Sequence, residues 1–297
     1  MLRMLLFVAL CSIATYAQCC NACGCGAAGS TSFGVLPLSD KHFIGIRNYF
    51  RSSNTHDASA PQNDSKEYFS TIDVLIRYYP IRFLQLVAVL PYQITQQTGG
   101  SNVSVNGWGD ASALVNYQLL GKRPIGAWIN NVWLGVGMKF PTGSYDLIQN
   151  RSTLSPYLQP GTGTYDYLFN AMHALKYKNW GWNTTVLYKV NEENKATRYQ
   201  FGNNWVLSSS IYHRFELKKI IMLPNINFSY QNDAKDKNYT VEEAQTGGQT
   251  SCIGVGTELF INQFNVGLTI SEPINDTHAI DMVKSNTRFL LTTIFNF

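Results

Sequence analysis

A two-residue alternation of apolar and polar side chains recurs through most of this chain, and it limits the possible folds more than any other feature. Successive side chains point to opposite faces of an extended strand, whereas an amphipathic helix would repeat about every 3.6 residues. In the closing stretch, Phe289 and Phe295 fall on one face and Arg288 falls on the other. The alternation therefore predicts strands with one apolar and one polar face.

We count about twelve such segments, all of them short and bounded by residues that favour turns, as is typical of strands. The predicted strands are residues 43–50, 68–79, 82–96, 107–120, 128–140, 163–178, 182–190, 199–215, 221–230, 250–261, 264–271 and 287–297. The chain is therefore expected to be all-β.

The connections between these strands alternate in length. Every second connection is a tight turn, at residues 80–81, 121–126, 179–181, 216–220 and 262–263. The others are long polar loops, at residues 51–66, 98–106, 141–162, 191–197, 231–249 and 272–286. Outer-membrane barrels have short periplasmic turns and longer extracellular loops, whereas a soluble β-sandwich has no reason to alternate loop length. We predict a transmembrane antiparallel up-and-down β-barrel over residues 41–297, in a bacterial outer membrane, with both termini periplasmic.

Composition favours membrane strands over membrane helices. Hydrophobic residues make up 45% and charged residues 14% of the 297 residues, and the mean hydropathy of -0.12 is too low for a helical membrane protein. In a barrel only every second residue meets lipid, so hydropathy averages out along each strand. The net charge of +4 is weak and no basic run is present, so we expect no nucleic-acid partner.

The chain begins with a predicted secretory signal peptide, residues 1–17. Arg3 precedes an apolar core, and a small-x-small cleavage site ends at Ala17. Residues 18–40 follow as a Cys- and Gly-rich periplasmic segment, which could fold into the barrel as a plug.

Four cysteines cluster at the start of this segment: Cys19, Cys20, Cys23 and Cys25. Thiolates at C-x-x-C and C-x-C spacing can converge on Cu(I) or Zn(II) from one short loop. The alternative is disulfide formation, which an oxidising periplasm favours. Because Cys252 is the one further cysteine after the signal peptide, the count is odd, and one thiol must stay free, pair between chains or bind a ligand.

The predicted inner faces carry more cations than anions. The cations are Arg47, Arg77, Lys139, Lys176, Lys189, Arg214 and Arg288, and the anions are Asp73, Asp110, Asp166 and Glu258. An excess of Lys and Arg would bias a lumen towards anionic solutes. Alternatively, these charges pair across a narrow lumen and fill it. For Asp110, Arg77 is a candidate partner.

Motifs of catalysis are absent from the sequence. The five histidines accompany no G-x-S-x-G, H-E-x-x-H or phosphate-loop motif. We do not predict an enzyme.

Two short motifs resemble a known family. Gly107-Trp108-Gly109-Asp110 opens one predicted strand, and Lys139-Phe140-Pro141-Thr142-Gly143 closes the next. In this order they resemble outer-membrane transporter-like barrels of the phenol and meta-cleavage degradation type, which are distantly similar to long-chain fatty-acid channels. The cysteine cluster is similar to the start of some Bacteroidetes-type barrel proteins.

The resemblance implies a channel or transporter for passive uptake or efflux of small hydrophobic or amphipathic solutes, surrounded by outer-membrane lipid. The terminal Phe297 also resembles the signal that barrel-assembly machinery reads on outer-membrane barrels. The alternative function is a metal-handling barrel that binds Cu(I) or Zn(II) at its N-terminal cysteines.

Overall fold

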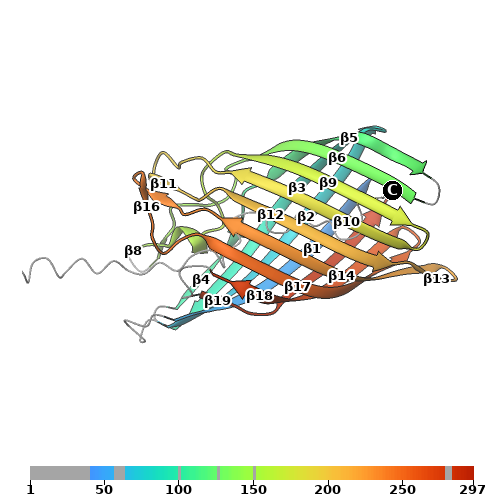
Figure 1. The fold of residues 1–297 in the computed structure, drawn as a ribbon. Coiled ribbons are helices and arrows are strands. Elements are labelled where there is room, and N and C mark those ends of the chain that lie inside the picture. Colours follow the sequence, from blue (N-terminus) through green and yellow to red (C-terminus); the bar gives the residue numbers. More distant parts are fainter. Residues whose placement is uncertain (1–40, 57–63, 100–101, 126–127, 150–151, 278–282) are drawn as a thin grey trace, which may run out of the picture.

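The computed structural model describes residues 41–56, 64–99, 102–125, 128–149, 152–277 and 283–297, and their strands close into one tilted antiparallel barrel of twelve strands (Figure 1). In chain order the barrel strands are β1 (Phe43–Thr55), β2 (Ser65–Ile81), β3 (Leu84–Thr98), β5 (Ser112–Ile125), β6 (Trp128–Lys139), β9 (Asp166–Tyr177), β10 (Trp180–Val190), β12 (Asn204–His213), β14 (Ile220–Asp233), β17 (Gly248–Ile261), β18 (Phe264–Asp276) and β20 (Arg288–Asn296). No helix in the described ranges is long and apolar enough to cross a membrane.

Three short strands lengthen the barrel wall. They are β4 (Val103–Trp108), which pairs with β3, β13 (Phe215–Leu217), which pairs with β14, and β19 (Val283–Ser285), which pairs with β1. The barrel closes where β1 pairs with β20, in a register that sets Phe43 opposite Asn296. Beyond this pair, the Phe297 N–H donates to the His42 carbonyl at 3.0 Å, so the last residue is held against the start of β1.

The outer face of the wall is apolar, as the alternation predicted. Ile46 and Val136 are 56% and 59% exposed, a state that lipid and not water suits. Arg47 and Asn116, on the inner face of the same wall, are both 1% exposed. This pattern confirms the predicted strand faces, because burial alternates residue by residue along each strand.

Long and short connections lie at opposite ends of the barrel, as expected (Figure 1). Connection 140–165 carries β7 (Ile148–Gln149), β8 (Ser152–Thr153) and the 3-10 helix η4 (Pro156–Leu158). Connection 191–203 carries β11 (Tyr199–Gln200), and connection 234–247 carries β15 (Lys237–Asn238) and β16 (Val241–Glu242), which join β11 in a small outer sheet. We call these three connections the outer loops. The marked C-terminus lies at the other end, among the tight turns.

Three of the tight turns contain a residue other than glycine with a positive φ angle. Lys178, Lys218 and Asn262 have φ angles of 51°, 54° and 55°. Two-residue hairpin turns of the primed types require positive φ, and they match the right-handed twist of the flanking strands. The turns that contain these three residues are therefore hairpins that fix the register of the strands they join.

Several predicted boundaries are wrong. Residues 80–81, predicted as a tight turn, end β2, and residues 121–125 of another predicted turn belong to β5. Residues 98–106 are not a long loop, because Val103–Trp108 forms β4 against β3, and Val103 and Val105 carry an alternation that their Gly, Ser and Asn neighbours obscure. Residues 199–215 are not one strand either. Tyr199–Gln200 leaves the barrel to pair with β15, and the barrel strand β12 begins only at Asn204.

Candidate functional site

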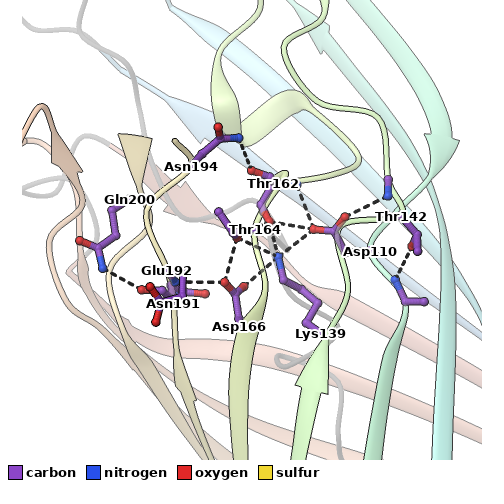
Figure 2. A network of polar contacts seen from close by, with 12 residues as sticks. Asp110, Lys139, Thr142, Thr162, Thr164, Asp166, Asn191, Glu192, Asn194 and Gln200 are labelled. Carbon is purple, nitrogen blue, oxygen red and sulfur yellow. Dashed lines mark hydrogen bonds and ion pairs between the residues drawn. The ribbon is translucent and has the colours of Figure 1, made fainter. Parts of the chain in front are cut away.

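A buried ion cluster lies where β6 meets the outer loops. Lys139, the last residue of β6, places its Nζ 2.7 Å from Asp110 Oδ2 and 2.8 Å from Asp166 Oδ2. All three residues are at most 5% exposed, and Figure 2 shows them pointing toward one another. One cation thus faces two carboxylates, and the low dielectric around them strengthens their attraction.

Asp110 binds both ends of connection 140–165 to the wall. Its Oδ1 accepts the Gly143 N–H at 3.0 Å, and its Oδ2 accepts the N–H and the hydroxyl of Thr162 at 2.9 and 2.8 Å (Figure 2). The Thr162 hydroxyl also contacts the Lys139 ammonium. Asp110 is therefore satisfied by backbone and side-chain donors, and it anchors the longest outer loop.

Glycines allow the segments of this cluster to approach closely. A Cβ on Gly143 would lie 2.8 Å from the Gly109 carbonyl carbon and 2.8 Å from the Gly161 Cα, which no side chain could occupy. The Gly109 N–H donates to the Pro91 carbonyl at 2.8 Å, in the gap between β4 and β5. Pro91 can stand in mid-wall because the ladder is interrupted beside it. The two sequence motifs therefore meet in one junction, which we call the motif junction.

The motif junction also reaches the second outer loop. Asp166 Oδ1 accepts the Thr164 hydroxyl at 2.8 Å and the Glu192 N–H at 3.2 Å. Asn194 donates from its Nδ2 to the Thr162 carbonyl at 2.9 Å. Connections 140–165 and 191–203 are thus held to the same cluster (Figure 2).

A second cluster joins all three outer loops. The hydroxyl oxygens of Tyr157 and Tyr199 are 2.7 Å apart, and Tyr199 donates to Asp236 Oδ2 at 2.6 Å. Asp236 also accepts the Gly202 N–H at 2.6 Å. The side chains of Tyr157, Tyr199 and Asp236 are all buried. We call Tyr157, Tyr199 and Asp236 the loop clamp.

Asp236 lies outside the membrane strands, and its environment disfavours charge. Burial raises the pKa of this carboxyl from 3.8 to about 7, the Gly202 N–H acts in the opposite direction, and Glu243 raises the pKa further. Asp236 N–H in turn donates to the Thr246 hydroxyl at 2.8 Å. The loop clamp therefore contains a carboxyl that titrates near neutral pH.

Two more predicted lumen cations have defined neighbours. Arg47 pairs with Asp73 at 2.7 Å, with side-chain exposures of 1% and 0%. Arg77 stacks over the Phe43 ring at 4.3 Å from its centroid and donates to the Lys41 carbonyl at 3.2 Å. The proposed pairing of Asp110 with Arg77 is wrong. Lys139 stands opposite Ser112, two residues from Asp110, whereas Arg77 stands opposite Phe43 on another part of the wall.

The other predicted lumen charges are spread around the wall. Lys176 is partly buried on β9, and Lys189 is buried on β10. Arg214 pairs with Glu216 at 3.1 Å near the tight-turn end. Glu258 is buried on β17 and accepts the Asn265 Nδ2–H at 3.2 Å, and Arg288 begins β20.

Sequence reasoning missed one inner carboxylate. Glu67 is 8% exposed and accepts hydrogen bonds from the hydroxyls of Ser53 and Thr55 at 3.1 and 3.2 Å. Extending the alternation of β2 by one residue toward its start would have placed Glu67 on the inner face. The loop clamp was also missed, because nothing in the sequence pattern links three loops that are far apart in the chain.

One side of the lumen is filled with side chains. Buried apolar residues from seven neighbouring strands form a cluster there, namely Phe43, Leu75, Val87, Val89, Leu114, Leu168, Leu187 and Ile294. Amides continue the filling: Gln85 Oε1 accepts from Asn116 at 2.8 Å, and Asn116 Oδ1 accepts from Asn170 at 3.0 Å. Side chains fill the lumen here as they do in small barrels.

A cavity lies on the other side, along β12, β14, β17, β18, β20 and the middle of β1, and about 100 Å³ of it is accessible to the centres of water-sized molecules. Residues that line it include Tyr49, Ser208, Asn227, Cys252, Glu258 and Arg288. Concave spaces that combine apolar surface with a few polar groups are typical of small-molecule sites. Of the predicted site residues, the cavity gathers Glu258 and Arg288, whereas the others lie at the motif junction or elsewhere on the wall.

The predicted metal ligands Cys19, Cys20, Cys23 and Cys25 lie outside the described residues, as do the signal peptide and the segment 18–40. Cys252 is described, and its free thiol is buried on the inner face of β17. Within the described part of the chain, no group of three or more His, Cys, Asp or Glu residues is placed to hold a metal ion.

An antiparallel barrel with an apolar outer face, tight turns at one end and long loops at the other is an outer-membrane β-barrel of the bacterial envelope. Residues 54–276 match the model of the family described as MetA-pathway of phenol degradation, and the chain belongs to this family. A comparison with curated protein sequences finds no match.

Solved structures show the same fold. An outer-membrane channel from Pseudomonas putida F1 superposes with a TM-score of 0.64 and 14% identity, covering 88% of this chain and 97% of that one. The β domain of the Bordetella autotransporter BrkA superposes with a TM-score of 0.50 and 11% identity, covering 87% of this chain and 100% of that one. At these identities the likeness extends to the fold alone.

Proposed function

We propose that this protein is a passive outer-membrane channel for small hydrophobic or amphipathic solutes. The observation that carries the proposal is the cavity inside the barrel, beside a part of the lumen that side chains fill. A barrel that served only as a scaffold would have no need of such a space. Family membership supports the proposal, and so does the fold shared with the outer-membrane channel from Pseudomonas putida F1.

The cavity wall mixes polar and apolar groups, which suits amphipathic solutes. Ser208 and Asn227 offer hydroxyl and amide groups, whereas Val206 and Leu290 offer aliphatic surface. Passage through such a space requires no catalytic step, and we propose none.

Planar bilayers provide the test, because purified protein should form channels in KCl that benzyl alcohol interrupts. We expect Ser229→Trp, which adds bulk inside the cavity, to lower single-channel conductance several-fold. Val255→Trp on the outer face, where the side chain is 62% exposed, is the matched control and should conduct like the parent protein. Bilayers that stay silent with the parent protein, or equal conductance in both variants, would refute the proposal.

We also propose that barrel-assembly machinery recognises the closing strand through Phe297. Phe297 directly follows β20, and it is 59% exposed with its ring 5.7 Å from the His42 ring, so a partner can reach it.

A further inference from the structure

Arg288 is the cation that lines the lumen cavity. Its Nη2 lies 3.5 Å from the Ser285 hydroxyl, and the Tyr49 hydroxyl hydrogen-bonds to its guanidinium. Its Nε is buried and has no hydrogen-bond partner among the described residues. Arg288 therefore has donor capacity that its neutral neighbours do not use.

Two buried cations of the wall differ from Arg288 in this respect. Arg47 is neutralised by Asp73, and Lys139 by Asp110 and Asp166. None of the described carboxylates forms an ion pair with Arg288.

Asp276 is the carboxylate whose charge acts on Arg288, and other donors hold it in place. The Thr250 hydroxyl donates to its Oδ1 at 3.3 Å, and the Ser285 N–H donates to its Oδ2 at 3.1 Å. Asp276 thus attracts the positive charge of Arg288 from a distance but forms no ion pair with it.

The surroundings of Arg288 fit an anion with an apolar body. Ser229, Ser271 and Asn227 add hydroxyl and amide donors to the same cavity, and Leu290 lines it with aliphatic surface. A guanidinium presents paired N–H groups that match the two oxygens of a carboxylate. The arrangement offers one strong anchor and an uncharged wall.

Glu258 limits how much negative charge the cavity accepts. Glu258 lines the same cavity as Arg288. It pairs with Gly267 on β18, and Gly267 pairs with Thr292 on β20, so Glu258 lies at the height of Thr292, four residues along β20 from Arg288. A second negative charge on the solute would meet Glu258 in a medium of low dielectric. The cavity therefore favours a single negative charge.

We infer that Arg288 is the anchor of a binding subsite for small organic monoanions, in which a carboxylate binds the guanidinium and the apolar body lies along the cavity. This inference rests on the channel function proposed above and names its solute class.

Benzoate and benzyl alcohol are suitable probes, because they share a ring and differ in charge. In planar bilayers with a sodium benzoate gradient, the reversal potential gives the permeability ratio of benzoate to sodium. We expect Arg288→Gln to lower this ratio about tenfold, as the loss of a charge-assisted hydrogen-bonded pair predicts. Interruption of the KCl current by benzyl alcohol should not change. Arg288→Lys keeps the positive charge but lacks the paired N–H donors of the guanidinium, so it should lower the ratio less.

Arg82→Gln removes the same charge from an exposed turn and should leave the ratio at the parent value. Suppose that the parent protein and Arg288→Gln both form channels of normal KCl conductance and have the same permeability ratio of benzoate to sodium. That result would overturn the subsite but not the proposed channel function. A parent protein that forms no KCl channel would overturn both proposals. If Arg288→Gln does not fold, Arg288→Lys decides, and an unchanged ratio in that variant overturns the subsite.

Discussion

Lys139 holds two carboxylates that would otherwise repel each other. Replacing it with Met keeps the apolar stem and removes the charge, so Asp110 and Asp166 are left buried without a cation. We expect Lys139→Met to lower the free energy of unfolding by about 3–5 kcal/mol, the range for breaking a buried ion pair from one side. Urea unfolding in detergent micelles, followed by tryptophan fluorescence, measures the change.

Lys219→Met is the matched control, because Lys219 is exposed in a tight turn and its replacement should shift stability by less than about 0.5 kcal/mol. A Lys139→Met variant as stable as this control would show that the motif junction does not depend on its ion pairs.

The sequence predicts on which face of the wall a side chain lies, but not which residue it contacts. Two-residue alternation places Arg47 and Asp110 on the inner face without structural information. The partner of Asp110 depends on the loop that Gly143 and Thr162 bring back to the wall, and alternation carries no information about loop paths. For this reason the expected contact with Arg77 was wrong although both faces were right.

At the scale of elements, the loop clamp links the outer loops through a carboxyl that titrates near pH 7. The folded pKa of Asp236 is raised above its ordinary value of 3.8, so the folded state binds a proton more tightly than the unfolded chain does. The stability that this provides is fully present below about pH 4 and is lost as pH rises through 7. The outer loops should therefore be held more tightly at pH 5 than at pH 8.

Hydrogen exchange of residues 234–247 at the two pH values, corrected for intrinsic exchange rates, measures this difference. Asp236→Asn mimics the neutral acid and should give protection that is independent of pH, whereas Glu242→Gln on the exposed strand β16 should behave like the parent protein. Equal protection of the parent protein at both pH values would contradict a titrating clamp.

The strands themselves were largely predictable, and their ends were not. Hydrophobic alternation and turn residues give the number, order and faces of the barrel strands because lipid and lumen impose opposite demands on successive residues. Above the membrane this demand ends. There β4 extends the wall although Gly, Ser and Asn obscure its apolar alternation, and short pieces such as β11 pair away from the barrel. Polar sequence was therefore taken for loop or for continuous strand.

At the scale of the whole molecule, we expect the last residue to contribute more to assembly than to stability. Phe297 is largely exposed, makes one backbone hydrogen bond with His42, and has its ring near the rings of His42 and Phe295. We expect deletion of Phe297 to reduce the folded, heat-modifiable fraction in outer membranes by half or more, since the proposed recognition by assembly machinery is lost. Refolding in detergent should be unaffected.

Phe264→Ala is the control, because Phe264 is 54% exposed on the outer face of β18 and also neighbours the closing strand. That variant should assemble normally in cells. Impaired refolding of the Phe297 deletion in detergent would instead assign Phe297 a role in intrinsic stability.

The seam between β1 and β20 sets the order of folding events. It joins Phe43 to Asn296, two residues from opposite ends of the described chain, so the barrel cannot close until all of the strands have been delivered. Contacts between residues so far apart in sequence form slowly, because the entropy of closing the intervening loop must be overcome first. Until then, two unpaired strand edges face each other across an open sheet and can pair with other chains. Closing the seam is thus the step that removes the last unpaired strand edges and, with them, the opportunity for pairing with other chains.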